Sequence, residues 1–209
     1  MFSIIQAAGW PIWFLIFASI AAIAIIIERF VSLQQKKILP PSLLEEAMAV
    51  STNKMPSSDI IQKLAGSSLM GGIFAAGIRA VQQTPNATEA DIRNAMERSG
   101  HLATHIMERF LPALATIAST GPLLGLFGTV IGMIEIFGAE QVAGQGDPTA
   151  VAHGISVALY NTAFGLLVAI VAYLFHHYFR SRVESYILLM EQNSERFARH
   201  LIRFVERKK

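Results

Sequence analysis

The 209-residue sequence contains no cysteine. Disulfide bonds, thiolate metal ligands and cysteine nucleophiles are therefore excluded. Charged residues are also scarce, because they make up 15% of the chain against about 25% in typical soluble proteins. Hydrophobic residues account for 53%. This balance favours a membrane protein over a soluble domain.

Lysine and arginine are missing from residues 1–28 and 110–179. The 17 basic residues form two blocks instead, nine between Arg29 and Arg109 and eight between Arg180 and Lys209. The parts without them contain three hydrophobic runs of 18, 25 and 22 residues: 10–27, 110–134 and 154–175. A spanning helix takes ~17–25 residues. The sequence therefore predicts an all-α membrane protein with three transmembrane helices and long cytoplasmic helical extensions.

The placement of the basic residues also predicts the topology, because basic segments stay on the cytoplasmic side. The first run is read as a retained span, since a signal peptide would need a basic start. The expected division is an outer N-terminal segment (1–9), a first transmembrane helix (10–27), a cytoplasmic helical domain (28–109), a second transmembrane helix (110–137), an outer loop (138–152), a third transmembrane helix (153–179) and a cytoplasmic C-terminal helix (180–209).

Two capping signals start the expected cytoplasmic helices. Ser42, followed three residues later by Glu45, and Thr88, followed by Asp91, each match a capping box. From about residue 89 to 137 the pattern shows no clear stop, so we expect one long helix that Pro112 and Pro122 kink without ending. The third transmembrane helix is likewise expected to continue to the end of the chain.

Glycines dominate one side of the second hydrophobic run. At ~100° per residue they fall within a stripe of roughly 60°, and they are Gly121, Gly125, Gly128 and Gly132. A helix face made only of glycine lets another backbone approach closely, as transmembrane helices do when they associate. We therefore expect this helix to line a tightly packed functional interior.

Thr129 lies beside that stripe, and Thr162 in the third run shares a face with small residues, namely Ala158, Gly165 and Ala169. Counted from the expected outer ends of the two helices, both hydroxyls lie ~12–15 Å deep, at nearly the same level. Two interpretations stay open: each threonine bonds back to a carbonyl of its own helix, or the pair lines a polar path.

Few ionisable residues lie near the expected spans. Glu135 is near the outer end of the second run. It is either an interfacial carboxylate or a proton entry point. The second and third hydrophobic runs contain no carboxylate at mid-depth. If the protein moves protons, the mid-membrane acid must come from another chain. Four residues of the cytoplasmic helix, Glu97, His101, His105 and Glu108, share a face, but nothing else in the sequence completes a metal site. No catalytic motif is present, so we expect no enzyme, no metal and no cofactor.

Two stretches resemble the ExbB/TolQ/MotA proton-channel family, and most closely its ExbB branch: Gly121–Ile134, which reads GPLLGLFGTVIGMI, and Ile155–Ile170, which reads ISVALYNTAFGLLVAI. The Glu28-Arg29-Phe30 end of the first span and the three-span topology fit as well. The sequence departs from the family where Val157 and Val171 stand, since many ExbB and TolQ chains have glutamate and proline there.

The resemblance implies a homo-oligomer, a pentamer, in the bacterial inner membrane with its N-terminus and the 138–152 loop in the periplasm. Its second and third spans would line a pore holding an ExbD/TolR-like single-span protein, whose aspartate carries the proton. The expected function is to energise TonB-dependent outer-membrane transport through a TonB/TolA-like protein. A TolQ-like role in envelope integrity and a passive membrane scaffold are the alternatives. The expected partners are these proteins and membrane lipids, without nucleic acid.

Overall fold

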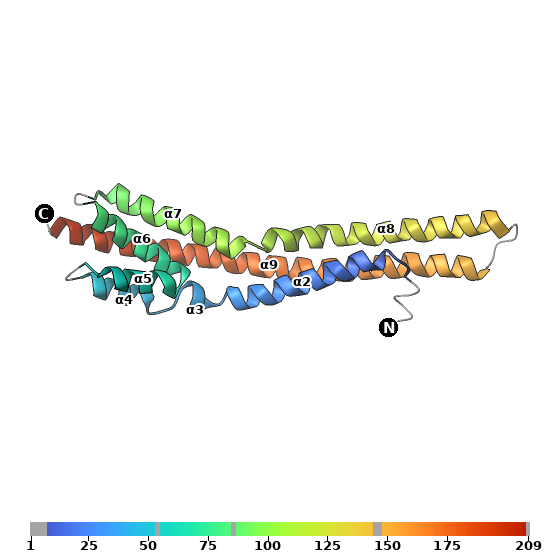
Figure 1. Ribbon diagram of the computed structural model, residues 1–209, viewed down its shortest axis with the longest axis horizontal. Coiled ribbons are helices and arrows are strands. Elements are labelled where there is room, and N and C mark those ends of the chain that lie inside the picture. The colour runs from blue at the N-terminus through green and yellow to red at the C-terminus, as the bar shows by residue number, and fades with distance from the viewer. Residues whose placement is uncertain (1–7, 53–54, 85–86, 144–147, 208–209) are drawn as a thin grey trace. The chain divides into compact units, whose positions relative to one another are not determined.

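The computed structural model describes residues 8–52, 55–84, 87–143 and 148–207, which contain helices and no strand. The helices are α2 (Ile12–Ser32), α3 (Gln35–Ile38), α4 (Leu43–Ser51), α5 (Ser58–Ser67), α6 (Leu69–Gln83), α7 (Glu89–Glu108), α8 (Leu111–Ala143) and α9 (Pro148–Arg207), as Figure 1 shows. Three helical stretches are long and apolar enough to cross a membrane: Ile12–Ser32, one within Glu89–Gly138 and one within Val151–Glu206. The expected all-α fold with three candidate spans is confirmed.

The chain divides into two compact units. One comprises Met1–Arg29 and Phe110–Tyr178, and we call it the apolar unit; the other comprises Phe30–Arg109 and Phe179–Lys209, and we call it the charged unit. α9 contributes to both of them. Each unit is described separately below.

In the apolar unit, α2 buries only a narrow side of its surface. Its buried apolar residues recur at helical spacing: Ile12, Leu15, Ala22 and Ile26. Large side chains cover the rest of the helix, and Phe17 is 75% exposed. An exposed surface this apolar suits contact with lipid, because hydrocarbon tails impose no penalty on it.

The expected single helix over about residues 89–137 is wrong in one respect. α7 ends at Glu108 and α8 begins at Leu111, with a turn at Arg109 and Phe110. Pro112 explains the break, since it lacks an N–H to donate to the carbonyl of Glu108 and its ring crowds that residue. Pro122, in contrast, lies inside α8, which continues through it.

Helices extend into both ends of the segment 138–152, which the sequence predicts as the outer loop. α8 runs on to Ala143 and α9 starts at Pro148, so only residues 144–147 remain between them, and these lie outside the described part. The N-terminal segment 1–9 also lies outside it, except for Ala8 and Gly9.

In the charged unit, one of the two capping signals is confirmed. Thr88 and Asp91 form the complete capping box at the start of α7, which lowers the pKa of the Asp91 carboxyl through the backbone N–H of Thr88. Ser42 precedes α4 as expected, but its side chain makes no cap hydrogen bond, because its own backbone is already helical. α9 continues without a break to Arg207, as expected.

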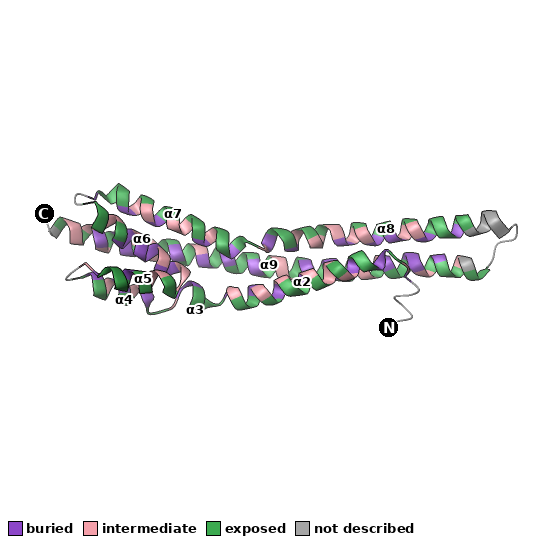
Figure 2. Cartoon of the chain, viewed as in Figure 1, coloured by how far each residue is buried: buried purple, intermediate pink, exposed green. Residues whose placement is uncertain are grey.

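Large side chains fill the core of the charged unit. The rings of Phe74 on α6 and Phe197 on α9 lie 4.4 Å apart, and both side chains are fully buried. At Gly77 on α6 an added methyl would meet the sulfur of Met96 at 2.8 Å. Burial of apolar side chains from water is therefore what stabilises this unit. Figure 2 shows the buried residues along α6.

Candidate functional site

The glycines of α8 pack against α9 within the apolar unit. A methyl group added to Gly132 would lie 2.5 Å from the carbonyl oxygen of Gly154, and one added to Gly125 would lie 3.0 Å from the carbonyl oxygen of Asn161. No side chain would fit between backbones this close. The close approach that the glycine stripe predicts therefore takes place between two helices of the same chain.

The opposing surface of α9 consists of the small residues that share a face in the sequence. Ala158, Gly165 and Ala169 are all buried. A methyl on Gly165 would lie 2.7 Å from the carbonyl oxygen of Gly121 and 2.9 Å from the Cα atom of Gly125. Figure 2 shows the buried residues spaced along α8 and this part of α9. The two small-residue stripes hold the helices together as a pair.

The two threonines hydrogen-bond in different ways. Thr129 donates to the carbonyl of Leu126 in its own helix at 2.5 Å. Thr162 donates across the pair to the carbonyl of Gly125 at 3.3 Å. Back-bonding therefore describes Thr129, whereas Thr162 links α9 to α8.

The two threonines are not at the same level, contrary to expectation. Thr162 lies opposite Gly125, which is four residues before Thr129 in α8. That separation is ~6 Å, about one helical turn. The error came from the assumed helix ends, because α8 extends to Ala143 and the loop that follows is short.

Both threonines nevertheless lie on one side of the α8–α9 pair. The other side is occupied by α2 and the residues before it: the ring of Trp10 lies 5.9 Å from that of Phe127 on α8, and Asn161 on α9 bonds the carbonyl of Ala8. At ~100° per residue, Thr129 lies roughly 160° around α8 from Phe127, and Thr162 lies ~100° around α9 from Asn161. Because the two helices run antiparallel, both rotations lead to the same side of the pair. The side away from α2 therefore carries both hydroxyls.

Around the two threonines that side is apolar and exposed. Its large side chains come from both helices, and they are Leu126, Met133, Leu159 and Leu166. Glu135 is also exposed, six residues beyond Thr129, which places it ~9 Å further along α8. At ~100° per residue it lies roughly 120° around the helix from Thr129, so it is not on this side. This side therefore presents two hydroxyls set among hydrocarbon.

Two polar residues of the apolar unit were not predicted from the sequence to be buried. Arg29 is 2% exposed. Its guanidinium donates to both carboxylate oxygens of Glu28, at 2.5 and 2.7 Å, and lies 5.0 Å from the centre of the Phe110 ring. Asn161 is fully buried. A signal for it was present, since it is the only carboxamide in the third hydrophobic run.

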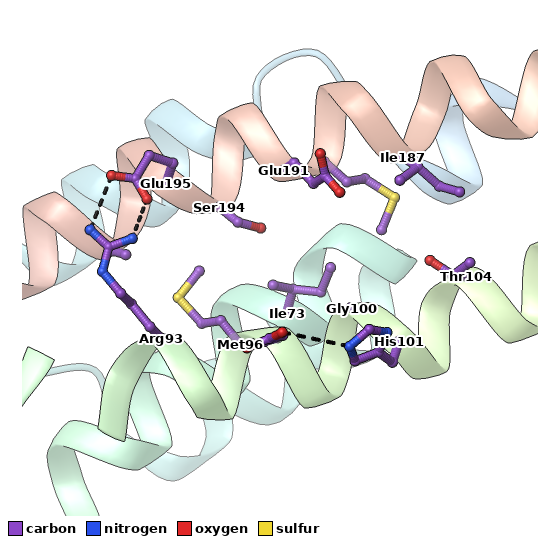
Figure 3. A pocket seen from close by; sticks show the side chains of 13 residues that line it. Ile73, Arg93, Met96, Gly100, His101, Thr104, Ile187, Glu191, Ser194 and Glu195 are labelled. Atoms are coloured by element: carbon purple, nitrogen blue, oxygen red, sulfur yellow. Dashed lines mark hydrogen bonds and ion pairs between the residues drawn. The ribbon is translucent and has the colours of Figure 1, made fainter. Parts of the chain in front are cut away.

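The charged unit contains a separate cavity of about 410 Å³ between α7 and α9. Figure 3 shows Arg93 of α7 and Glu195 of α9 pointing at each other beside it. Arg93 bonds Glu195 with both of its terminal nitrogens, and this partner lowers the pKa of the Glu195 carboxyl. The ion pair ties the two helices together.

Two of the four residues considered as a metal site line the cavity. Glu97 and His101 lie in its wall, and His101 Nε2 is 3.7 Å from a carboxylate oxygen of Glu97. Figure 3 shows His101 beside the cavity. His105 and Glu108 are exposed elsewhere on α7. Within the described residues no three histidine or acidic side chains gather closely enough to hold a metal.

Comparison with known proteins gives a matching family and several similar proteins. Residues 65–192 match the model of the MotA/TolQ/ExbB proton channel family. A Synechocystis protein named putative biopolymer transport protein ExbB-like 3 is 29% identical over 180 residues, which cover 85% of this chain and 84% of that protein. The Tol-Pal system protein TolQ of Haemophilus influenzae is 40% identical over 111 residues, about half of each chain. A Methanothermobacter thermautotrophicus protein named as an ExbB homologue is 41% identical over 98 residues, which cover 47% of this chain and 34% of that protein.

Proposed function

The chain belongs to the MotA/TolQ/ExbB proton channel family, and from this membership we propose that it is an inner-membrane stator subunit that uses the proton motive force. Together with an ExbD-like single-span partner it energises TonB-dependent transport across the outer membrane. The observation that carries the proposal is the side of the α8–α9 pair away from α2, because it bears the hydroxyls of both Thr129 and Thr162.

In this proposal several copies of the chain, five by resemblance to the family, surround a pore. Each α8–α9 pair forms one part of the wall, with the side that bears the threonines toward the pore. The buried small residues contribute to the pore wall indirectly, because they set how closely the two helices pack. They are Gly125, Gly128, Gly132, Ala158, Gly165 and Ala169. Glu135 stands at the periplasmic mouth, where it receives protons.

The partner supplies the titrating group. The hydrophobic run that enters α8 (110–134) contains no aspartate or glutamate, and neither does the run in α9 (154–175). A proton cannot cross the hydrocarbon region without a group to carry it. Each threonine hydroxyl has a single hydrogen to donate. When the partner helix brings a carboxylate, the hydroxyl leaves the carbonyl of Leu126 or Gly125 and stabilises the carboxylate by donating to it instead.

The threonines provide the direct test. Thr129→Val and Thr162→Val preserve side-chain shape but remove the hydroxyl, so we expect intact oligomers and energy transduction reduced roughly two- to tenfold. The control is Thr116→Val, because Thr116 is exposed and bonds only the carbonyl of Pro112 in its own helix. Normal transport by both pore variants would overturn the threonine assignment and favour a passive scaffold.

The proposed orientation has its own test. A reporter fused after Lys209 should be cytoplasmic, and one inserted near Gln145 should be exported. The reverse pattern would overturn the topology and with it the placement of Glu135 at the periplasmic side.

A TolQ-like role is the second candidate, because two TolQ proteins are among the relatives, at 40% and 38% identity over about half of the chain. Expression in cells lacking ExbB and in cells lacking TolQ separates the two roles. Restored uptake through TonB-dependent receptors supports the first, whereas restored resistance to detergents supports the second.

A further inference from the structure

The cavity between α7 and α9 in the charged unit is apolar inside. Met96, Met190 and Ala198 line it and are buried. Its volume is about 410 Å³, and an apolar cavity of about 150 Å³ is already large enough to bind benzene. The cavity therefore has room for two aliphatic side chains supplied from outside.

Carboxylates surround the opening of this cavity. Glu97 of α7 and Glu191 of α9 line it and are exposed, so they mark where it meets the surface. Figure 3 shows Glu191 on the α9 side. Glu195 lines the cavity as well, but Arg93 bonds it and neutralises its charge. The opening therefore keeps a net negative charge and favours an apolar segment that carries a basic residue.

Another side of α7 presents such a segment. Arg98, Leu102 and Ile106 follow one another at intervals of four residues, which puts them on one side of the helix. Leu102 is 66% exposed and Ile106 is 48% exposed, and Arg98 is exposed too. We call these three residues the α7 ridge. Covering its two aliphatic side chains removes apolar surface from water, which is favourable.

The α7 ridge and the cavity lie on opposite sides of α7. Leu102 is two residues away from Gly100 and from Thr104, which both line the cavity. At ~100° per residue it lies roughly 160° around the helix from each of them. A surface and its complement on opposite sides of one subunit join copies head to tail, and such contacts close into a ring where the rotation allows it. The occupant that fits the cavity is therefore a second copy of this chain.

We propose that the α7 ridge of each copy packs into the α7–α9 cavity of the next copy, so that every copy gives one such contact and receives one. The inference rests on the proposed function only for the presence of several copies around a pore. In a ring whose axis runs along α7 and α9, neighbouring copies are rotated without a shift along the helices. Residues at one level within a copy are then at the same level between copies.

The levels within one copy follow from the ends of the cavity. Figure 3 shows Arg93 beside Glu195 at one end and Thr104 near Ile187 at the other. Because the residue numbers rise along α7 while they fall along α9, the two helices run antiparallel. The ion pair between Arg93 and Glu195 gives a reference level from which both helices can be counted.

This count predicts which residues meet between copies. Arg98 is five residues beyond Arg93, and Glu191 is four residues before Glu195, so the two differ in level by ~1.5 Å. Leu102 and Ile187 are nine and eight residues from the same ion pair and differ as little. The basic residue of the ridge thus meets a carboxylate at the opening, and its leucine meets an apolar residue of the wall.

The absence of cysteine from the chain allows a direct test by cross-linking the full oligomer in membranes. With Leu102→Cys and Ile187→Cys in one chain, a short thiol-reactive cross-linker should join the copies into a ladder that ends at the complete ring. When half of the copies carry only Leu102→Cys and half only Ile187→Cys, linked dimers alone should form. The control pairs Ile187→Cys with Ile60→Cys, because Ile60 of α5 is 44% exposed and belongs to neither surface.

The outcomes separate this inference from the proposed function. An oligomer of unchanged mass that gives no ladder, or a control pair that gives the same ladder, would overturn the ridge contact and leave the proposed function intact. A wild-type chain that is monomeric in the membrane would overturn both, because no ring could then surround a pore.

The charges give a second test, which needs no cysteine. Arg98→Glu and Glu191→Arg each turn the expected attraction into a repulsion, so each should raise the dissociated fraction of the detergent-solubilised oligomer roughly two- to fivefold. The two changes together should restore the wild-type fraction. Arg79→Glu is the control, since Arg79 is an exposed arginine of α6 outside both surfaces, and it should change nothing. Single variants that dissociate like the wild type, or a double variant without recovery, would contradict the pairing of Arg98 with Glu191.

Discussion

Helices pack by opposite means in the two units. In the apolar unit, α8 and α9 meet backbone to backbone, and a methyl on Gly132 would strike the carbonyl oxygen of Gly154 at 2.5 Å. In the charged unit, large side chains separate the helices, as the rings of Phe74 and Phe197 do at 4.4 Å.

The difference follows from the solvent on the outside. Lipid tails are as apolar as leucine, so helices in a bilayer gain little by burying large side chains and associate through close contact instead. Helices in water gain by removing apolar surface from it. The same α9 obeys both rules along its length, with Gly165 and Ala169 buried in one unit and Phe197 and Leu201 buried in the other.

The largest expected effect concerns side-chain packing in the charged unit. Phe74→Ala should destabilise that unit by about 3–5 kcal/mol, because it removes a fully buried ring and leaves a cavity. Hydrogen exchange measured by mass spectrometry should show faster exchange in α6 and in the α9 residues around Phe197, and no change in α8. Faster exchange in α8 as well would mean that the two units do not unfold separately.

The second prediction concerns backbone contact in the apolar unit. Gly132→Ala should cost about 1–3 kcal/mol, because the new methyl group meets backbone atoms that cannot move aside. The matched control is Gly138→Ala in the same helix, where a methyl group would meet nothing within 4 Å. Thermal unfolding of the purified protein in detergent should show a lower midpoint for the first variant only. Equal midpoints would contradict backbone-to-backbone packing.

The sequence predicted the features that depend on local patterns. Helical periodicity and the absence of basic residues located the three spans, and the glycine stripe correctly indicated close helix contact. Thr88 and Asp91 form the predicted capping box. Such features depend on neighbours in the sequence, which can be read without a structure.

The sequence left undetermined what depends on register between distant segments. The level of Thr162 against α8 changed by about a turn once the helix ends were known. Asn161 bonds the carbonyl of Ala8, which is 153 positions away in the sequence, and Arg29 lies over the ring of Phe110. Periodicity carries no information about either contact.

The last and smallest effect concerns the ion pair between Arg93 and Glu195, which has no counterpart among the described residues of the α8–α9 contact. The Arg93 guanidinium lowers the pKa of the Glu195 carboxyl. The pair therefore stabilises the charged unit above the usual pKa range of a carboxyl group, and this contribution is lost as the pH falls through the lowered pKa. Glu195→Gln should reduce the thermal midpoint slightly at neutral pH, and the difference from wild type should disappear in acid.

Salt should shrink that difference too, because both side chains are partly exposed, at 40% and 38%, and such pairs are screened. The matched control is Glu184→Gln, since Glu184 pairs with Arg180 along α9 itself at 3.0 Å and joins no second helix. Only Glu195→Gln should speed amide exchange in α7 next to the cavity. If Glu184→Gln does so equally, the charge of α9, and not the link between helices, is what stabilises the charged unit, and the contrast with the apolar unit rests on side-chain packing alone.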